Sequence, residues 1–280
     1  MKKFTLSSPA KINLFLHIVG RRPDGYHNLQ SVFAILNKGD KLTFEERMDD
    51  KIEILPDLGF NVEDNIVYKA IMLLRKETSI SKGITITIEK NIPMGGGLGG
   101  GSSNAATTLL ALNKLWNLNL TTKRLCELGK TLGADVPIFV NGYSAFAQGI
   151  GEILTPYKIE EKYYLVVTPK NTHVSTKEIF THLDLPRSTP ALAISQISYE
   201  ETHNDCENLV KKNYPSVAKC LQWLLKYAHP RMTGTGASCF APFDNLSDAQ
   251  KAQNELPEQY SSFIAKATNK SILLDELDKI

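Results

Sequence analysis

The sequence predicts an α+β protein of two domains. A segment of alternating β-branched residues at 84–88 leads through a glycine-rich run into an apolar helical pattern that begins near residue 102. Strand and helix patterns are interspersed along the 280 residues, a length that favours two domains or one large one. A turn-rich stretch at 149–161 precedes a new strand. We therefore expect one domain over residues 1–155 and a second over residues 156–280.

The first domain is expected to begin with two strands, at 4–19 and 29–36, joined by a turn that contains Asp24-Gly25. Short strands follow, and then a helix with an apolar face behind a cap at Asp64 or Asn65. The remaining expectations are short strands at 41–45 and 51–55, the capped helix at 65–78, a strand at 84–88, helices at 102–117 and 122–131, and a strand at 143–148.

The second domain is expected to be rich in helices, with strands between them. Its expected elements are a strand at 163–168, helices at 175–183, 207–212, 216–227 and 247–255, and strands at 238–241 and 263–268. The last residues, 271–280, are either a short helix or a frayed tail.

The charge balance gives no support to a nucleic-acid or membrane partner. Lysine and arginine number 32 against 30 acidic residues, so the formal net charge is +2 and no strong field results. The cysteines, Cys126, Cys206, Cys220 and Cys239, lack metal-ligand or disulfide spacing. The start of the chain lacks the apolar core of a signal peptide, and no stretch is long enough to span a bilayer. We expect a cytoplasmic protein.

The glycine-rich run is the most informative segment of the chain. Glycine lets a phosphate approach the main chain, and the amides and dipole of a following helix favour negative charge. No Lys-Ser or Lys-Thr pair follows, so the run is not the common P-loop. A flexible linker is the alternative, but linkers seldom lie between a good strand and a good helix. The run predicts a nucleoside triphosphate site formed by Pro93, Met94, Gly95, Gly96, Gly97, Leu98, Gly99, Gly100, Gly101, Ser102 and Ser103.

Two further segments supply charged or polar groups suited to phosphoryl transfer, which needs positioning and charge neutralisation more than covalent work. Lys11 and Asn13 share one face of a strand by period-two geometry, although an exposed edge strand would explain them equally well. Asp135 lies between a glycine-alanine pair and apolar residues, where it is either a helix cap or a functional acid that orients a hydroxyl or accepts its proton.

A second glycine-rich turn precedes an apolar strand near the end of the chain. It contains Gly234, Thr235 and Gly236 and leads into Ala237-Ser238-Cys239-Phe240. Such a turn could close over phosphates or substrate, and a tight entry into the strand is an equally good interpretation of these residues alone.

Taken in this order, the segments resemble the small-molecule kinases of the galactokinase, homoserine, mevalonate and phosphomevalonate kinase superfamily, the GHMP kinases. The resemblance covers nearly the whole chain and includes Pro9-Ala10-Lys11-Ile12-Asn13-Leu14 and Gly133-Ala134-Asp135-Val136-Pro137. It implies an N-terminal domain of the ribosomal-protein-S5-like type, a C-terminal ferredoxin-like α/β sandwich, and an active site in the cleft between them.

The resemblance also implies an activity and roles for particular residues. ATP would be the cosubstrate, with Mg²⁺ expected beside its phosphates and no certain protein ligand for the ion. Asp135 would be the base or orienting acid, Lys11 its electrostatic partner, and Asn13 a donor to the substrate hydroxyl or the phosphates. Asn65 and Ile66 would border the adenine. The oligomeric state expected is a monomer or weak homodimer.

The element Arg22-Pro23-Asp24-Gly25-Tyr26-His27 resembles the branch of this superfamily whose substrate carries a cytidine diphosphate moiety. Tyr26 would stack on the cytosine, His27 would bond its edge, and Phe180 would stack on the other side or belong to the core. This branch acts in isoprenoid precursor synthesis. Two alternatives stay open: a superfamily kinase of mevalonate or homoserine, and a non-catalytic nucleotide- or RNA-binding domain.

Overall fold

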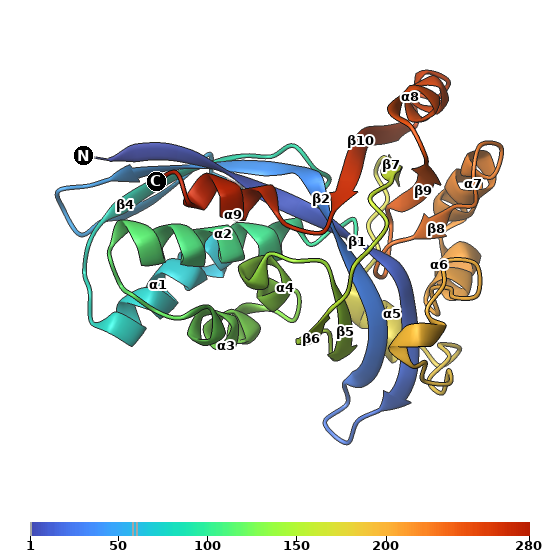
Figure 1. Cartoon of the computed structure of the whole chain (residues 1–280), viewed down its shortest axis with the longest axis horizontal. Helices are drawn as coiled ribbons and strands as arrows, with labels where there is room; N and C mark the ends of the chain where they lie inside the picture. Colours follow the sequence, from blue (N-terminus) through green and yellow to red (C-terminus); the bar gives the residue numbers. More distant parts are fainter. Residues whose placement is uncertain (1, 58, 60) are drawn as a thin grey trace.

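A computed structural model describes residues 2–57, 59 and 61–280. The chain begins with a long antiparallel hairpin formed by β1 (Lys3–Arg21) and β2 (His27–Glu46), which runs across the molecule (Figure 1). The pairing register shifts between Pro9 and Lys11 and at two later places along β1. Such irregularities bend a strand and re-aim its side chains. The hairpin therefore reaches from the N-terminal helices to the C-terminal part of the chain.

The prediction of separate strands at 29–36 and 41–45 was wrong, because β2 runs through both. The residues between them have the composition of a turn, but Gly39 lies opposite Pro9 in the ladder. A Cβ atom on Gly39 would lie 1.9 Å from the carbonyl oxygen of Ser8. This glycine therefore permits close approach of two backbones at a bulge.

The first sheet is built around β2 and is covered by helices that share one core (Figure 1). Its other strands are β3 (Ile52–Leu55), β4 (Ile84–Glu89), β5 (Ala145–Gly149) and β6 (Ile153–Pro156). Its helices are α1 (Ile66–Thr78), α2 (Gly100–Leu115), α3 (Thr122–Leu132), α4 (Val136–Asn141) and α9 (Ile272–Leu277). Helix α2 consists largely of small and apolar residues, and residues on most of its circumference are buried, so it lies inside this core.

The second sheet is antiparallel, in the order β10-β7-β9-β8. Its strands are β7 (Tyr163–Pro169), β8 (Arg231–Met232), β9 (Cys239–Phe243) and β10 (Tyr260–Thr268). The accompanying helices are α5 (Thr176–Thr181), α6 (Glu207–Asn213), α7 (Pro215–Leu224) and α8 (Leu246–Asn254). Strand β7 is apolar on both faces: Leu165 packs with the helices, whereas Val166 packs with the hairpin.

The two sheets are joined, because Ala267 and Thr268 of β10 pair with β2. Short 3₁₀ helices, η1 (Val62–Asp64) and η2 (Ile194–Gln196), complete the regular elements of the described residues. Helix α9 follows β10 and returns to the core of the first sheet. The end of the chain is thus a short helix, one of the two alternatives expected for it.

The predicted α+β fold of two domains is confirmed, and most predicted elements lie within a few residues of their observed positions. Helix α4 and strand β6 were not predicted: α4 is a short apolar turn behind Asp135, and β6 lies in the stretch predicted as turns. The division at residue 155 stays a prediction.

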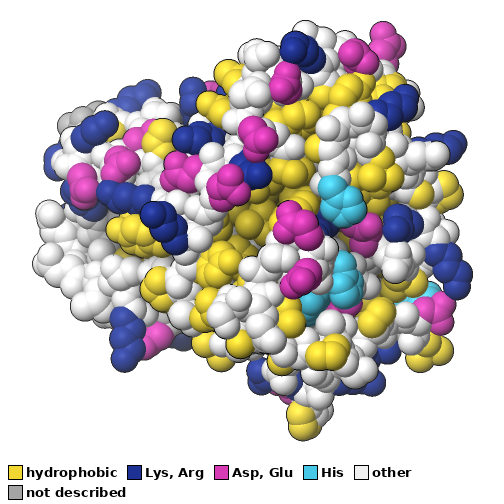
Figure 2. Space-filling model, turned by 45° about the vertical axis from the view of Figure 1, so that its right-hand side comes forward, with side chains coloured by type: hydrophobic (Ala, Val, Ile, Leu, Met, Phe, Trp, Pro, Cys, Tyr) yellow, Lys and Arg dark blue, Asp and Glu magenta, His cyan; other side chains and the backbone are white. Residues whose placement is uncertain are grey.

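Figure 2 shows that lysine and arginine side chains alternate with acidic ones on the face it presents, around a hollow lined with hydrophobic side chains. This mixture agrees with the small formal net charge of +2. Among the helices of the described residues, none combines the length and apolar character needed to cross a membrane.

Candidate active site

A buried lysine and a partly exposed aspartate form the centre of the site. Lys11 Nζ lies 3.3 Å from Asp135 Oδ2, and the side chains are 3% and 32% exposed respectively. Lys11 Nζ also donates to Asn13 Oδ1 at 2.6 Å and to the carbonyl oxygen of Gly97 at 3.1 Å. A buried ammonium group needs such partners to offset the loss of water. The structure therefore brings together Lys11, Asn13 and Asp135, which the sequence singled out.

Asn13 is fixed on every side by hydrogen bonds. Its amide nitrogen Nδ2 donates to Ser31 Oγ at 2.9 Å, and its backbone N–H donates to Thr233 Oγ1 at 3.0 Å. Thr233 Oγ1 lies 3.3 Å from both Asn13 Oδ1 and the carbonyl oxygen of Gly97. Thr233 thus connects β1, the glycine-rich run and the second glycine-rich turn, a role that its position beside this turn did not predict.

Asp135 occupies the N-cap position of α4, as one interpretation of the sequence proposed. Within the described chain, however, its side chain makes no capping hydrogen bond. Its carboxylate instead pairs with Lys11 and lines a cavity. An acid at this position is able to accept the proton of a bound hydroxyl. Lys11 lies beside this carboxylate and would stabilise the oxygen that loses the proton.

The glycine-rich run forms a wall between two cavities. Gly97, Gly99 and Ser102 line both of them. Gly97 has a φ of +77°, and a Cβ atom there would lie 2.3 Å from the carbonyl oxygen of Thr233. Only glycine fits so close to the second turn. A molecule in one cavity can therefore reach a molecule in the other across this run.

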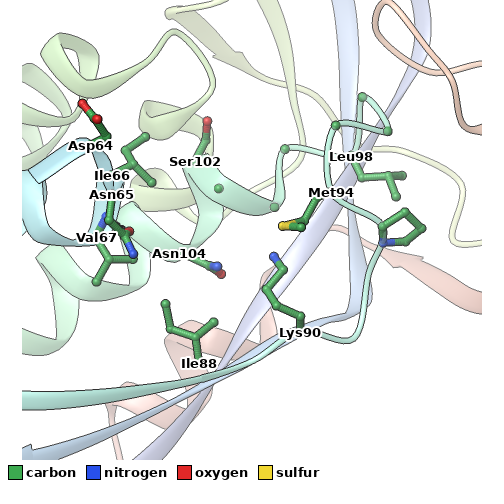
Figure 3. A pocket seen from close by; sticks show the side chains of 17 residues that line it. Asp64, Asn65, Ile66, Val67, Ile88, Lys90, Met94, Leu98, Ser102 and Asn104 are labelled. Carbon is green, nitrogen blue, oxygen red and sulfur yellow. Dashed lines mark hydrogen bonds between the residues drawn. The ribbon is translucent and has the colours of Figure 1, made fainter. Parts of the chain in front are cut away.

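The first cavity has a volume of about 430 Å³ and lies between the glycine-rich run and α1 (Figure 3). Asn65 caps α1 by accepting the Val67 N–H at 2.9 Å, and Asn65 and Ile66 both line the cavity. The loop residues predicted to bind the triphosphate, from Pro93 to Ser102, all line it as well. Its size and its glycine wall suit a nucleotide.

Lys90 is a residue of this cavity that sequence reasoning missed. It follows β4 and extends toward the glycine-rich run (Figure 3). A Cβ atom on Gly100 would lie 3.6 Å from Lys90 Nζ. The ammonium group pairs with the buried carboxylate of Asp40, which also accepts backbone N–H groups of residues 91 and 92. The signal in the sequence was a lysine at the end of the strand that leads into the loop.

The two serines at the start of α2 differ in whether their side chains reach the cavities. Ser102 lines both cavities, whereas Ser103 is fully buried and its Oγ accepts a hydrogen bond from Ser8 Oγ at 2.9 Å. Consecutive helical residues point about 100° apart. Of this pair, the structure therefore places only Ser102 at the cavity walls.

The second cavity has a volume of about 270 Å³ and contains the Lys11–Asp135 pair. Phe180, Gly234 and Thr235 line it, while Gly236 does not. Thr235 Oγ1 lies 2.9 Å from the hydroxyl of Thr176 at the start of α5. This bond ties α5 to the second glycine-rich turn, and so Phe180 is held at the cavity.

The three residues predicted to bind the base differ in burial and in their position relative to the second cavity. The rings of His27 and Phe180 stack, with centroids 5.5 Å apart, and His27 is buried. Burial lowers the pKa of His27, and the nearby cations Arg187 and Arg21 lower it further. Tyr26 is 61% exposed, and of the predicted base-binding residues only Phe180 lines the second cavity, whereas Tyr26 and His27 do not. The structure thus brings His27 and Phe180 together and leaves Tyr26 at the surface.

The metal-binding capacity of the site rests on oxygen atoms. Across residues 2–57, 59 and 61–280, no group of three or more His, Cys, Asp or Glu side chains could hold a metal ion. Mg²⁺ prefers oxygen ligands, retains water and is bound largely by phosphates in kinases. The Ser102 hydroxyl and the Asp135 carboxylate at the cavity walls are donors of this kind. The residues therefore fit an Mg²⁺ ion carried by a nucleotide.

Comparison with protein families gives matches in both halves of the chain. Residues 65–143 match the GHMP kinases N terminal domain, and residues 189–262 match the GHMP kinases C terminal domain. The chain is 52% identical to a 4-diphosphocytidyl-2-C-methyl-D-erythritol kinase of Pseudoalteromonas atlantica, covering 96% of this chain and 94% of the relative. It is 50% identical to the Colwellia psychrerythraea protein of the same name, covering 100% and 95%.

Solved structures agree with these matches. A crystal structure of 4-(cytidine 5'-diphospho)-2C-methyl-D-erythritol kinase superimposes with a TM-score of 0.84 at 30% identity, covering 94% of this chain and 98% of that one. The Methanococcus jannaschii mevalonate kinase superimposes with a TM-score of 0.67 at 16% identity, covering 96% and 98%, and shows a shared fold alone.

Proposed function

The chain belongs to the GHMP kinases, and from that membership we propose that it transfers the γ-phosphoryl group of ATP to the 2-hydroxyl of 4-diphosphocytidyl-2-C-methyl-D-erythritol. The products are ADP and the 2-phosphate of the cytidyl compound. Relatives with 52% and 50% identity over almost the whole chain carry the name of this kinase. The reaction belongs to the non-mevalonate (MEP) route to isoprenoid precursors.

The observation that carries this proposal is the position of the Lys11–Asp135 pair beside the wall that the two cavities share. The glycine-rich run separates a cavity of nucleotide size from one that contains the pair. A phosphoryl group held at Gly97 and Gly99 would thus face a hydroxyl held beside Asp135. Phosphoryl transfer needs this in-line placement of donor and acceptor.

We assign the catalytic roles from this geometry. Asp135 accepts the proton of the 2-hydroxyl of the substrate. The oxygen of that hydroxyl bonds to the γ-phosphorus of ATP, while the bond between the γ-phosphorus and the oxygen that leaves with ADP breaks. Lys11 stabilises the oxygen that loses the proton. Asn13 holds Lys11 in place through its Oδ1, at 2.6 Å from Lys11 Nζ.

The residues that line each cavity indicate which part of each bound molecule would lie there. Asn65, Ile66 and Lys90 line the first cavity, where the adenine and phosphates of ATP would lie. Phe180 lines the second cavity and stacks on His27, and the cytosine would lie beside this pair. Mg²⁺ bound with ATP, near Ser102, would neutralise charge on the phosphates.

We further propose that the enzyme works in the cytoplasm as a monomer or weak homodimer. Its described cysteines, Cys126, Cys206, Cys220 and Cys239, are free thiols, which suits a reducing compartment.

Product analysis by mass spectrometry tests the proposal. ATP and Mg²⁺ are supplied with 4-diphosphocytidyl-2-C-methyl-D-erythritol, and with mevalonate or homoserine in parallel reactions. We expect one phosphate to be added to the cytidyl compound alone. Phosphorylation of only mevalonate or homoserine would support a kinase activity and refute the assignment of the cytidyl compound as substrate. Absence of every product would favour a binding domain without activity.

The Asp135→Asn variant tests the catalytic assignment in the same assay. It removes the proton acceptor at nearly constant shape, and we expect turnover to fall by about 10³-fold. The matched control is Asp248→Asn, which alters an exposed aspartate paired with Lys251 on α8 and should keep full turnover. Full turnover in Asp135→Asn would refute the role assigned to Asp135.

A further inference from the structure

Arg187 connects the loop after α5 to the base-binding histidine. Its Nε donates to His27 Nε2 at 3.2 Å. Its Nη atoms donate to the backbone carbonyls of His182, Leu183 and Leu185, at 2.5 to 3.2 Å. The guanidinium group is thereby anchored to its own loop at several points. Its orientation toward His27 is therefore fixed by the fold.

This contact determines which nitrogen of His27 carries a proton. A guanidinium group has five N–H donors and no acceptor, so the nitrogen that faces it must offer a lone pair. His27 Nε2 is therefore unprotonated, and the single proton of the neutral ring lies on Nδ1. Burial and the cations Arg187 and Arg21 lower the pKa of His27, which keeps the ring neutral.

The ring held in this way is connected to the second cavity through Phe180. His27 stacks on Phe180 with an angle of 27° between the ring planes, and Phe180 lines the cavity together with Lys11 and Asp135. Neither Arg187 nor His27 is among the residues that line the cavity, so Arg187 acts on the site through His27 and its stacked partner Phe180.

We propose that Arg187 is a positioning residue that sets base specificity, because it holds His27 in the Nδ1–H tautomer. The proposal rests on the proposed function, since it takes the wall formed by His27 and Phe180 as the cytosine side of the cavity. Cytosine presents acceptors at O2 and N3, whereas uracil presents an N–H donor at N3. A histidine with one fixed donor favours cytosine, because the donor at uracil N3 would find no acceptor on it.

¹⁵N NMR spectra of histidine-labelled protein report the tautomer directly. The chain has six histidines, and a His27→Gln spectrum assigns the signals of His27. At pH 8 we expect a protonated Nδ1 and a bare Nε2 in the wild type, and a shift of the proton toward Nε2 in Arg187→Met. A wild-type ring protonated at Nε2 would overturn the proposal.

Arg21→Met is the matched control for the spectra. Arg21 lowers the pKa of His27 through its charge alone, whereas Arg187 also donates a hydrogen bond to the ring. Arg21→Met should therefore leave the tautomer unchanged. Equal changes in both variants would show that charge, and not the hydrogen bond, sets the tautomer, which would refute the role of Arg187.

Kinetics test the specificity that follows from the tautomer. The measured quantity is the ratio of kcat/KM for the cytidyl substrate to that for its uridyl counterpart. We expect Arg187→Met to lower this ratio about tenfold, chiefly through the KM of the cytidyl substrate, with the KM for ATP unchanged. Arg187→Gln keeps an N–H donor and should restore most of the ratio, provided that it folds as the wild type does.

The two proposals fail in different ways. A wild-type protein that phosphorylates no cytidyl substrate refutes the proposed function, whatever the tautomer of His27. A wild-type protein that phosphorylates it, while Arg187→Met keeps both the ratio and the wild-type spectrum, refutes the positioning role alone.

Discussion

The proposed phosphoryl-transfer centre is held by the fold in a different way from the proposed base-binding wall, which consists of Tyr26, His27 and Phe180. At the centre, Lys11, Asn13 and Thr233 are almost fully buried and hydrogen-bonded to one another. At the wall, Tyr26 is 61% exposed and His27 is held by Phe180 and one arginine contact. The centre is therefore determined by several elements at once, and the wall by few contacts. Substitutions at the centre should lower kcat, and those at the wall should raise KM.

The largest effect is expected from Lys11→Met, which removes the charge at the centre and keeps most of the volume. We expect kcat to fall about 10³-fold, because the developing negative charge loses its stabilising ammonium group. The KM of the cytidyl substrate should change little. Steady-state kinetics of the folded variant measure both quantities.

A lysine away from the site serves as the control for this substitution. Lys162 pairs with Glu160 and Asp244, and Lys162→Met should keep the wild-type kcat. If Lys11→Met raised KM and kept kcat, the centre would not be distinct from the wall, and the comparison would fail.

The next effect is expected from Thr233→Val, which preserves shape and removes the hydroxyl that joins three segments. Thr233 Oγ1 accepts the Asn13 N–H at 3.0 Å. Its loss leaves buried groups without partners, so the free energy of unfolding should fall by about 1–3 kcal/mol. We also expect kcat to fall by about tenfold, because Asn13 no longer holds Lys11 firmly.

Thr107→Val is the matched control, because it makes the same change in another buried threonine. Thr107 Oγ1 has no hydrogen-bond partner among the described residues, so removing this hydroxyl should leave stability unchanged or raise it. Urea unfolding curves of both variants test this contrast. A similar loss of stability in both would show that the bonds of Thr233 add nothing beyond packing.

At the wall, Tyr26→Ala should affect only the binding of the cytidyl substrate. Stacking of a base on an aromatic ring contributes about 1–3 kcal/mol, so KM for this substrate should rise roughly tenfold while KM for ATP stays the same. Tyr143 is exposed, as Tyr26 is, but forms a backbone bridge with Lys270 away from His27 and Phe180, and Tyr143→Ala provides the control. Equal rises in both Michaelis constants would contradict a stacking role.

The elements and the glycine-rich loop could be predicted from the sequence because local patterns determine them. Period-two spacing places Lys11 and Asn13 on one face of a strand, and the glycine run lies between a clear strand and a clear helix. The pairing of Lys11 with Asp135 depends on the packing of α4, which itself escaped prediction. Chemistry could suggest this pair, but local sequence could not place it.

The supporting residues could not be predicted because their partners are far away along the chain. Thr233 bonds Asn13 across 220 positions, and Arg187 bonds His27 across 160. Ser103 looked equivalent to Ser102 in the sequence, but the direction of each side chain depends on how α2 is rotated against β1. Such contacts follow from the tertiary fold.

The smallest effect is expected from substitution of His17 and concerns the pH dependence of stability. This residue joins the hairpin to the segment at 203–205. Its ring lies 4.6 Å from that of His203 and is buried. Burial is the main cause that lowers its pKa; His203 and Arg231 lower it further, and Asp205 opposes them. Its Nδ1 has no partner among the described residues. A proton on this ring would therefore be bound more weakly in the folded protein than in the unfolded chain.

The sign of the pH dependence follows from this lowered pKa. The unfolded chain takes up the proton near the ordinary value of 6.5, so the contribution of His17 to stability is complete above that pH. It is lost as the pH falls through 6.5 and then through the lower pKa of the folded state. We expect His17→Gln to flatten the dependence of the unfolding free energy on pH between 7.5 and 5.5, with kcat and both KM values unchanged at pH 7.5. His27→Gln should flatten the same dependence but also raise the KM of the cytidyl substrate, since His27 belongs to the wall. If His17→Gln raised that KM as well, His17 would also take part in binding the cytidyl substrate, and its role would not be limited to stability.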